Sequence, residues 1–212
     1  MNNPLYGLYA ITDATLLPDS ATLLSQVEAA LRGGAAVIQY RDKSEDPQRR
    51  LDQASALVAL CARYQRPLLV NDDIDLALAA NAAGVHLGQG DGDARSARRR
   101  LGPRAIIGIT CHNQLPLALQ AQQQGADYVA FGAFFPSQTK PGAAPAPLAL
   151  LSAARRRLSV PIVAIGGISR DNAPQVIDHG AQMIAVVGSL FEGTDTELRA
   201  RELTQLFPDH AL

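Results

Sequence analysis

Residues 160–188 read VPIVAIGGISRDNAPQVIDHGAQMIAVVG, in which two short apolar runs flank a polar segment of helical spacing. Each apolar run is closed by glycine, and the polar segment ends in His179-Gly180. A glycine at that position can end a helix with a positive φ. Runs that are apolar at every position, rather than at alternate positions, are typical of parallel strands buried on both faces. The stretch therefore predicts a strand, a helix and a second strand parallel to the first.

The same strand–helix unit recurs along the whole chain. Six further segments resemble these two strands: LYGLYAITD (5–13), GGAAVIQYR (33–41), PLLVND (67–72), AGVHLGQ (83–89), AIIGIT (105–110) and DYVAFG (127–132). A helix-like segment follows each strand, and Ser20 is a suitable N-cap for the first helix. Eight such units without a change of composition predict one domain over residues 1–212, a (β/α)8 barrel of the TIM type. The alternative is a doubly wound open sheet, but its usual glycine-rich first turn is missing from ITDATLLPDS (11–20).

Composition narrows the class of protein. Hydrophobic residues make up 47% of the 212 residues and charged residues 18%, which is enough apolar material for a large core and too little charge for disorder. The formal net charge of −1 gives no reason to expect a nucleic-acid or membrane-surface protein, and we expect neither partner. The two cysteines form no CxxC motif, and we find no signal peptide, so we expect a cytoplasmic protein. A homo-oligomer is possible, and the sequence does not decide the oligomeric state.

Two residue types that often carry catalysis are given structural interpretations. Cys111 and His112 are adjacent on an extended chain and point apart, which argues against a catalytic Cys–His pair. His86 lies in the middle of a strand and is interpreted as a core histidine with satisfied hydrogen bonds. The arginine triplets 98–100 and 155–157 fall late in expected helices, where cations are favoured, and are interpreted as solvated faces.

Polar residues gather at the carboxyl ends of the expected strands. In strand order these ends read Gln39-Tyr40-Arg41-Asp42-Lys43, Asn71-Asp72-Asp73, Gln89-Gly90-Asp91, Thr110-Cys111-His112-Asn113, the loop of residues 134–147, Gly166-Gly167 and Gly188-Ser189. In a barrel these ends share one face and build the active site. Taken singly, Asn71 and Asp72 suit a helix cap and residues 39–43 suit a solvated turn. Their convergence on one face favours the functional interpretation.

The residue types at this face suit a diphosphate and a monophosphate. Two carboxylates from adjacent strands suit Mg²⁺, which keeps waters and is completed by substrate phosphates. Arg41, Lys43 and Lys140 offer a planar fork and two point charges for phosphate oxygens. Glycines after the last two strands let backbone N–H groups approach a second phosphate. The sequence therefore predicts a Mg²⁺-dependent enzyme that acts on small phosphorylated substrates.

This ordered set of motifs resembles the thiamine phosphate synthase family over nearly the whole chain. The motifs are QYRDK, NDDIDLA, GVHLGQGD, IGITCHN, FFPSQTKPG, AIGGI and AVVGSLF. Enzymes of that family join hydroxymethylpyrimidine diphosphate to thiazole phosphate, releasing diphosphate and forming thiamine phosphate. The resemblance thus implies a transferase of thiamine biosynthesis.

Site residues carry over position by position. The resemblance implies that the pyrimidine diphosphate is bound by Gln39, Arg41, Lys43, Asn71, Thr110 and Lys140, and that Tyr40 and Asp42 also belong to the substrate-binding residues. It implies that Ser137, Gln138, Thr139, Gly167, Val187 and Gly188 line the thiazole phosphate site. Asp72 and Asp91 would hold Mg²⁺, and Arg41, Lys43, Thr110 and Lys140 would act in catalysis.

Departures from the family pattern leave one assignment open. Ser137 and Thr110 exchange one hydroxyl residue for another, and Gly188 replaces a frequent serine. Gly90 replaces a common acidic residue, so either Asp91 or Asp93 is the second metal ligand, with Asp91 favoured by its position in GQ-x-D.

Three other functions compete with the synthase. A related barrel that aromatises the thiazole would not need the diphosphate and metal residues that are present here. A phosphosugar isomerase or epimerase, suggested by GGI and VVGSL, would need a carboxylate or histidine placed for proton transfer. A non-catalytic sensor of thiamine precursors gives no reason for paired carboxylates.

The position of Lys140 after three polar residues gives a direct test. Lys140→Ala should weaken binding of the pyrimidine diphosphate more than binding of the thiazole phosphate, because the lysine is assigned to the leaving diphosphate. Calorimetry on each ligand measures both affinities, and the reverse order would contradict the assignment.

Overall fold

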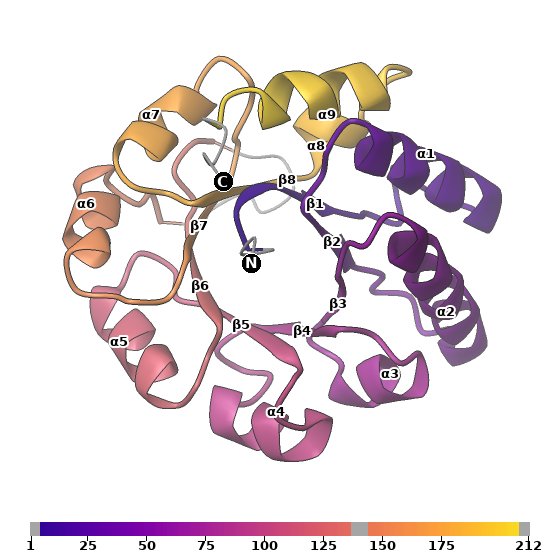
Figure 1. Ribbon diagram of the computed structural model, residues 1–212, viewed down its shortest axis with the longest axis horizontal. Coiled ribbons are helices and arrows are strands. Elements are labelled where there is room, and N and C mark those ends of the chain that lie inside the picture. The colour runs from indigo at the N-terminus through magenta and orange to yellow at the C-terminus, as the bar shows by residue number, and fades with distance from the viewer. Residues whose placement is uncertain (1–4, 137–143, 208–212) are drawn as a thin grey trace.

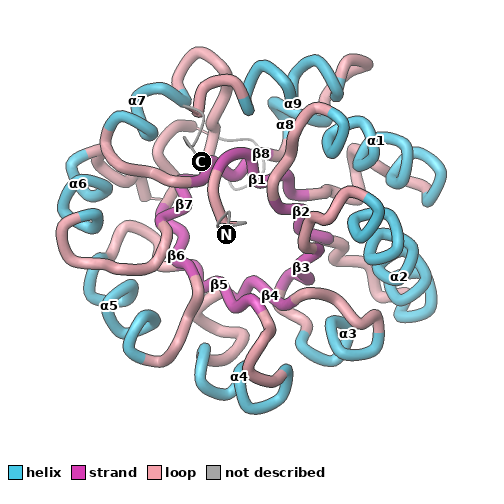
Figure 2. Tube along the Cα trace, in the orientation of Figure 1, coloured by secondary structure: helices cyan, strands magenta, loops and turns pink. Residues whose placement is uncertain are grey.

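The computed structural model describes residues 5–136 and 144–207, and these form a closed barrel of eight parallel strands in chain order (Figures 1 and 2). The strands are β1 (Gly7–Ile11), β2 (Val37–Tyr40), β3 (Leu68–Asn71), β4 (Gly84–Leu87), β5 (Ile106–Thr110), β6 (Tyr128–Phe131), β7 (Ile162–Ile165) and β8 (Met183–Val186). The helices are α1 (Ser20–Arg32), α2 (Pro47–Arg63), α3 (Ile74–Ala79), α4 (Ala94–Leu101), α5 (Leu115–Gln123), α6 (Ala149–Arg155), α7 (Ala173–Asp178), α8 (Gly188–Phe191) and α9 (Thr196–Thr204). Pairing of β1 with β8 closes the ring, so the predicted barrel is confirmed and an open sheet with reversed strand order is excluded.

Each strand is buried on both faces, which explains why its sequence does not alternate. Along β1, Leu8 and Ala10 pack in the layer between the barrel and the helices, whereas Tyr9 and Ile11 pack inside the barrel. The helices surround the ring of strands on its outer side (Figure 1). Inward-facing side chains of the described residues pack against one another in the barrel interior, as in other barrels of this size.

Aspartates begin the first four helices. Asp19, Asp46, Asp73 and Asp93 are the N-caps of α1 to α4, and each carboxylate accepts a hydrogen bond from a backbone N–H in the first turn. Ser20 was expected to cap the first helix, but that expectation is wrong by one residue, because Asp19 is the cap and Ser20 begins the helix. A carboxylate at this position is also stabilised by the positive end of the helix dipole.

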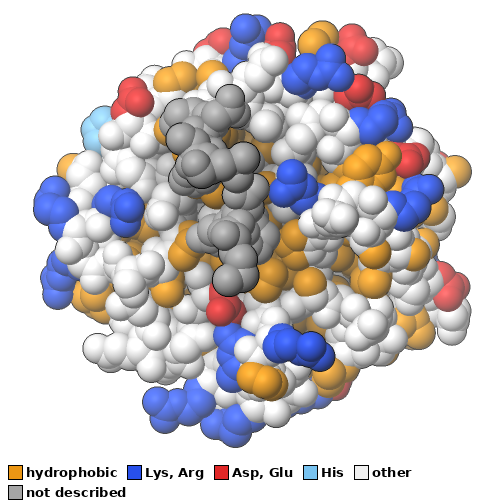
Figure 3. All heavy atoms as spheres, in the orientation of Figure 1, with side chains coloured by type: hydrophobic (Ala, Val, Ile, Leu, Met, Phe, Trp, Pro, Cys, Tyr) orange, Lys and Arg blue, Asp and Glu red, His pale blue; other side chains and the backbone are white. Residues whose placement is uncertain are grey.

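Arginines lie near helix ends, as the sequence indicates. Arg98, Arg99 and Arg100 occupy the last turn of α4, and Figure 3 shows basic side chains along the lower edge of the displayed face, over this helix. Arg98 reaches the carboxylate of Asp127 at 2.6 Å.

Within the described part of the chain, no helix is long and apolar enough to cross a membrane.

Close contact between β4 and β5 gives a test of the barrel. A Cβ added at Gly84 would lie 1.8 Å from the carbonyl oxygen of Ile106, so the two backbones would have to separate. Gly84→Ala should lower the free energy of unfolding by about 3 kcal/mol, measured by urea denaturation. Gly90→Ala is the matched control, because no atom lies within 4 Å of its added Cβ. Equal stability of the two variants would contradict this packing.

Candidate active site

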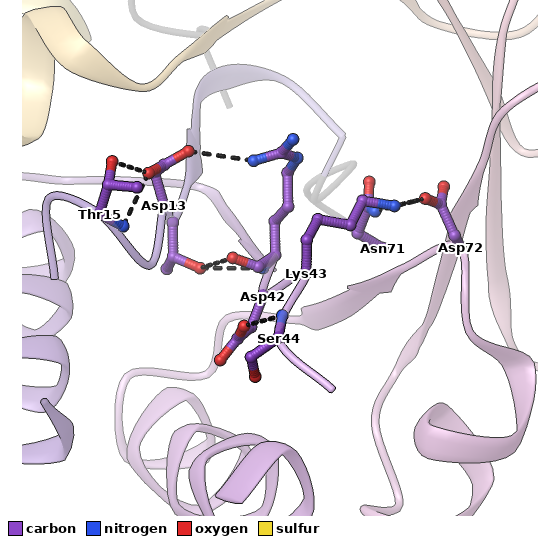
Figure 4. Close-up of polar contacts among 9 residues, drawn as sticks. Asp13, Thr15, Asp42, Lys43, Ser44, Asn71 and Asp72 are labelled. Atoms are coloured by element: carbon purple, nitrogen blue, oxygen red, sulfur yellow. Dashed lines mark hydrogen bonds and ion pairs between the residues drawn. The ribbon is translucent and has the colours of Figure 1, made fainter. Parts of the chain in front are cut away.

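A cleft of about 400 Å³ opens at the carboxyl ends of β2, β3 and β4. Its lining residues are Asp42, Lys43, Ser44, Arg50, Asn71, Asp72, Asp73, Ile74, Asp75, Asp91 and Arg100. Figure 4 shows Lys43 extending from the turn after β2 toward Asn71 and Asp72 at the end of β3. Residues that are distant in sequence thus meet at the face where the sequence analysis placed the active site.

The carboxyl groups of Asp72 and Asp91 lie close enough for each to shift the pKa of the other. Oδ2 of Asp72 also accepts hydrogen bonds from Lys43 Nζ at 2.5 Å and from Asn71 Nδ2 at 2.7 Å. Asp72 has a positive φ of 62°, unusual for a residue other than glycine, and this backbone orientation directs the side chain to its partners. The carboxylate of Asp91 accepts the backbone N–H of Gly88 at 2.9 Å.

The two aspartates have opposite pKa shifts. Burial acts to raise the pKa of Asp72, but its contacts with Lys43, Asp91 and Asn71 outweigh burial and hold that pKa below its ordinary value. Burial, followed by the adjacent charge of Asp72, raises the pKa of Asp91. Two carboxyl groups this close resist ionising together unless a cation lies between or beside them.

The neighbouring aspartates serve another purpose. Asp73 caps α3 and Asp93 caps α4, and Asp93 Oδ1 accepts the N–H of Ser96 at 2.8 Å. Neither Asn71 nor Asp72 is therefore the helix cap that the alternative interpretation suggested. Of the two candidates for the second metal ligand, Asp91 lies against Asp72, and this contact supports Asp91 over Asp93.

The segment QYRDK divides between two sides of the sheet. Gln39 faces the barrel interior, whereas Tyr40 faces the helices and its hydroxyl donates to Gln53 Oε1 at 2.8 Å. The carboxylate of Asp42 is 1% exposed, lies 3.5 Å from Arg49 and accepts the N–H of Ser44 at 2.7 Å. The side chains of Tyr40 and Asp42 therefore hold the turn in shape. Substrate contact by these two residues stays a prediction.

A chain of hydrogen bonds crosses the barrel interior and joins two predicted site residues. Gln39 Nε2 donates to the hydroxyl of Tyr9 at 2.6 Å, and the hydroxyls of Tyr9 and Tyr128 are 2.7 Å apart. His86 Nδ1 lies 2.8 Å from the Tyr128 hydroxyl, and His86 Nε2 lies 2.8 Å from Thr110 Oγ1. Burial raises the pKa values of Tyr9 and Tyr128, so both phenols are neutral at physiological pH. Gln39 and Thr110 are thus held by one buried network.

Sequence reasoning found only part of this network. The interpretation of His86 as a buried, hydrogen-bonded residue is confirmed, since its side chain is 8% exposed and both ring nitrogens have partners. Tyr9 and Tyr128 were missed, although each is a polar ring within an apolar strand. That position was the available signal, because a buried Tyr hydroxyl usually has a hydrogen-bond partner.

The ends of β7 and β8 lie side by side. Gly167 has a φ of 60°, and Val187 and Gly188 lie where β8 passes into the short helix α8. The Ser189 hydroxyl donates to the carbonyl oxygen of Ile168 at 2.7 Å and so joins the two loops. The structure therefore brings Gly167, Val187 and Gly188 to one end of the barrel, as predicted.

Three further observations complete the site. Ser137, Gln138, Thr139 and Lys140 lie outside the described residues. Cys111 is fully buried and burial raises its pKa to about 12, which agrees with its exclusion as a nucleophile.

Among the described residues, no group of three or more His, Cys, Asp or Glu side chains could hold a metal ion. A cation at Asp72 and Asp91 would therefore need further ligands other than a third carboxylate, imidazole or thiolate of the described residues.

The fold and the cleft define a class of protein, the (β/α)8-barrel enzymes with acidic and basic side chains grouped at the C-terminal face. The family model described as thiamine monophosphate synthase matches residues 8–190. The chain is 55% identical over 203 residues to a thiamine-phosphate synthase of Thioalkalivibrio sulfidiphilus, with 96% of each chain covered. It is 53% identical over 201 residues to the enzyme of the same name from Thiobacillus denitrificans, covering 95% of this chain and 94% of that relative.

A solved structure agrees with both sequence comparisons. Thiamine phosphate pyrophosphorylase from Pyrococcus furiosus matches with a TM-score of 0.86 and 35% identity, and 96% of each chain is covered. This chain belongs to the thiamine monophosphate synthase family. The predicted transferase of thiamine biosynthesis is thereby confirmed at the level of the family.

The interior network gives a prediction about stability. Tyr128→Phe removes the hydroxyl between Tyr9 and His86, which leaves buried polar groups without this partner. The free energy of unfolding should fall by about 2 kcal/mol in urea denaturation. Tyr64→Phe is the control, because its hydroxyl bonds Glu28 at the partly buried edge of α2 and should change stability by about 0.5 kcal/mol or less. An equal loss of unfolding free energy in both variants would mean that the buried hydroxyl of Tyr128 stabilises the fold no more than the partly buried hydroxyl of Tyr64 does.

Proposed function

We propose that this chain joins hydroxymethylpyrimidine diphosphate to thiazole phosphate, releases diphosphate and forms thiamine phosphate. The observation that carries the proposal is the contact between Asp72 and Asp91 beside Lys43, at the carboxyl ends of neighbouring strands. Family membership supplies the substrates, and the cleft supplies suitable groups to bind a diphosphate.

The described residues fit a magnesium ion at Asp72 and Asp91. The donors are carboxylate oxygens, which Mg²⁺ prefers, and their small number suits an ion that keeps waters and substrate phosphates as ligands. Apart from Asp42, whose buried carboxylate pairs with Arg49, the cleft is lined by four carboxylates, Asp72, Asp73, Asp75 and Asp91, against three cationic side chains, Lys43, Arg50 and Arg100. A bound diphosphate would add negative charge to this excess, which a divalent cation would offset. When bound, Mg²⁺ would stabilise the charge that develops on the leaving diphosphate.

Arg41 and Lys43 would bind the diphosphate. Both follow β2, and both have side chains paired with carboxylates: Arg41 with Asp13 at 3.0 Å and Lys43 with Asp72 at 2.5 Å. Lys43 is the more exposed of the two, with 59% of its side chain accessible. Lys43 could therefore turn from Asp72 toward a phosphate oxygen if a bound cation compensated the charge of that carboxylate. Lys140 would add a third cation.

The reaction needs no protein nucleophile. The amino group of the pyrimidine can stabilise a positive methylene, so the diphosphate can leave before the thiazole nitrogen attacks. Gln39 and Thr110 would orient the pyrimidine, because the buried network fixes both side chains before substrate binds. The barrel would exclude water from the cationic intermediate.

The backbone at Gly167, Val187 and Gly188 would bind the thiazole phosphate, together with Ser137, Gln138 and Thr139. Glycine at 167 and 188 permits close approach of backbone N–H groups to phosphate oxygens. The two substrates would then enter from different sides of the barrel mouth and meet over its centre.

A reducing compartment suits this chain. Cys61 and Cys111 are both free and buried, and burial raises the pKa of each to about 12. We therefore place the protein in the cytoplasm, and a homo-oligomer stays a prediction.

Matched neighbours separate metal ligands from helix caps. Asp72→Asn and Asp91→Asn should each lower coupling activity by at least about 100-fold and weaken Mg²⁺ binding, because a ligand charge is lost. Asp73→Asn and Asp93→Asn should retain both activity and most of their stability, because asparagine caps a helix about as well as aspartate does. Activity is measured with both substrates and Mg²⁺ binding by calorimetry with inorganic diphosphate.

Chelation completes that test. Wild-type activity should disappear in EDTA and return with added Mg²⁺. Full activity in EDTA would remove the metal from the proposal, and normal activity of Asp72→Asn would reduce Asp72 to a structural residue.

A further inference from the structure

We propose that Asp13 is a positioning residue that holds the Arg41 guanidinium in place to bind the diphosphate. The inference rests on the proposed function, in which Arg41 binds that group. Asp13 lies in the turn after β1, and Arg41 follows the neighbouring strand β2. The parallel pairing of β1 with β2, which aligns Ile11 with Gln39, therefore brings the two residues together.

The Asp13–Arg41 contact is well defined. Arg41 Nη1 donates to Asp13 Oδ2 at 3.0 Å, and the two side chains are only 23% and 12% exposed. Figure 4 shows Asp13 and Thr15 together on one turn, and Lys43 on the opposite side of the view, toward Asp72. Among the described residues, Asp13 is the one side chain that holds the guanidinium, and a single N–H group is used. The remaining N–H groups of the planar fork are left for an anionic ligand.

Asp13 is itself held firmly. Its Oδ1 accepts hydrogen bonds from the Thr15 amide at 2.9 Å and the Thr15 hydroxyl at 2.5 Å. Burial acts to raise the pKa of Asp13, but the Thr15 contacts and Arg41 outweigh burial and lower the pKa below its ordinary value. The carboxylate is therefore charged at neutral pH. Its Oδ1 binds Thr15 in the turn, and its Oδ2 binds Arg41.

The same turn holds the backbone of Arg41. Thr12 Oγ1 accepts the N–H of Arg41 at 2.9 Å, and the N–H of Thr12 donates to the carbonyl of Gln39 at 2.9 Å. Thr12 thus fixes where the Arg41 side chain begins and Asp13 fixes where it ends. A long side chain fixed at both ends loses little further rotamer freedom when it binds a phosphate.

A purely structural role for Asp13 would come from its bonds to Thr15, which shape the turn. Asp13→Asn separates the two roles. Asparagine keeps an oxygen for the Thr15 amide, but it removes the charge and presents an N–H donor to Arg41. A residue that only shapes the turn would tolerate this change.

The first measurement is the affinity for inorganic diphosphate in the presence of Mg²⁺, by calorimetry, together with KM for the pyrimidine diphosphate. Asp13→Asn should weaken diphosphate binding by about 10-fold, the scale of a hydrogen bond between charged groups. Asp127→Asn is the matched control, since Asp127 also pairs with an arginine (Arg98, 2.6 Å) and also accepts a backbone N–H (Ile107, 2.7 Å). That pair lies at the opposite end of the barrel, so diphosphate affinity should stay within about twofold of wild type.

A double-mutant cycle shows whether Asp13 acts through Arg41. In an Arg41→Ala background, Asp13→Asn should change diphosphate affinity by no more than about twofold, because the side chain it positions is gone. An equal loss in both backgrounds, or a single variant that binds as wild type does, would overturn the inference while leaving Arg41 as a ligand. If Arg41→Ala itself binds diphosphate normally, the proposed role of Arg41 fails, and the inference fails with it.

Thermal unfolding of each variant is measured first. If Asp13→Asn does not fold, Asp13→Ser takes its place, since a serine hydroxyl also forms this kind of turn and carries no charge. The same affinities and the same cycle then apply.

Discussion

Pairing of β1 with β8 is the constraint on which the rest of the molecule depends. Tyr9 aligns with Ala185 across this seam, and closure places every strand between an inner and an outer apolar layer. A polar group on the inner side must then find its partner inside the barrel, because unpaired buried groups are costly. The hydrogen bonds that run from Gln39 to Thr110 satisfy this requirement. The same bonds fix Gln39 and Thr110, the two side chains proposed to orient the pyrimidine, so stability and the proposed preorganisation have one cause.

Residues adjacent in sequence are assigned to different tasks by the direction of the chain at each strand end. Asp72 turns toward the cleft through its positive φ, whereas Asp73 caps α3. Asp91 reaches Asp72, whereas Asp93 caps α4. Residue type alone does not separate the members of these pairs. Their roles follow from whether a backbone N–H of the next helix or another carboxyl group is within reach.

This explains how far the sequence could predict the structure. Unbroken apolar strands and polar strand ends were enough for the barrel and for the face that carries Lys43, Asn71 and Asp72. Ser20 was misplaced as a cap because serine and aspartate both accept the same hydrogen bond. The contact between Asp13 and Arg41 was not predicted, because it joins two strand ends whose alignment depends on the register of β1 and β2.

Charge in the free cleft points to the order of events during binding. Lys43 partly compensates Asp72, but burial and the charge of Asp72 still raise the pKa of Asp91, so the acidic pair is not fully neutralised. If the pair holds Mg²⁺ as proposed, Lys43 would no longer be needed to compensate Asp72 and could bind the incoming diphosphate. Arg41 needs no such release, because Asp13 occupies only one of its N–H groups among the described residues. The Arg41 side chain would then be in position before the metal binds, and the Lys43 side chain only afterwards. Tight diphosphate binding would thus depend on the presence of the metal.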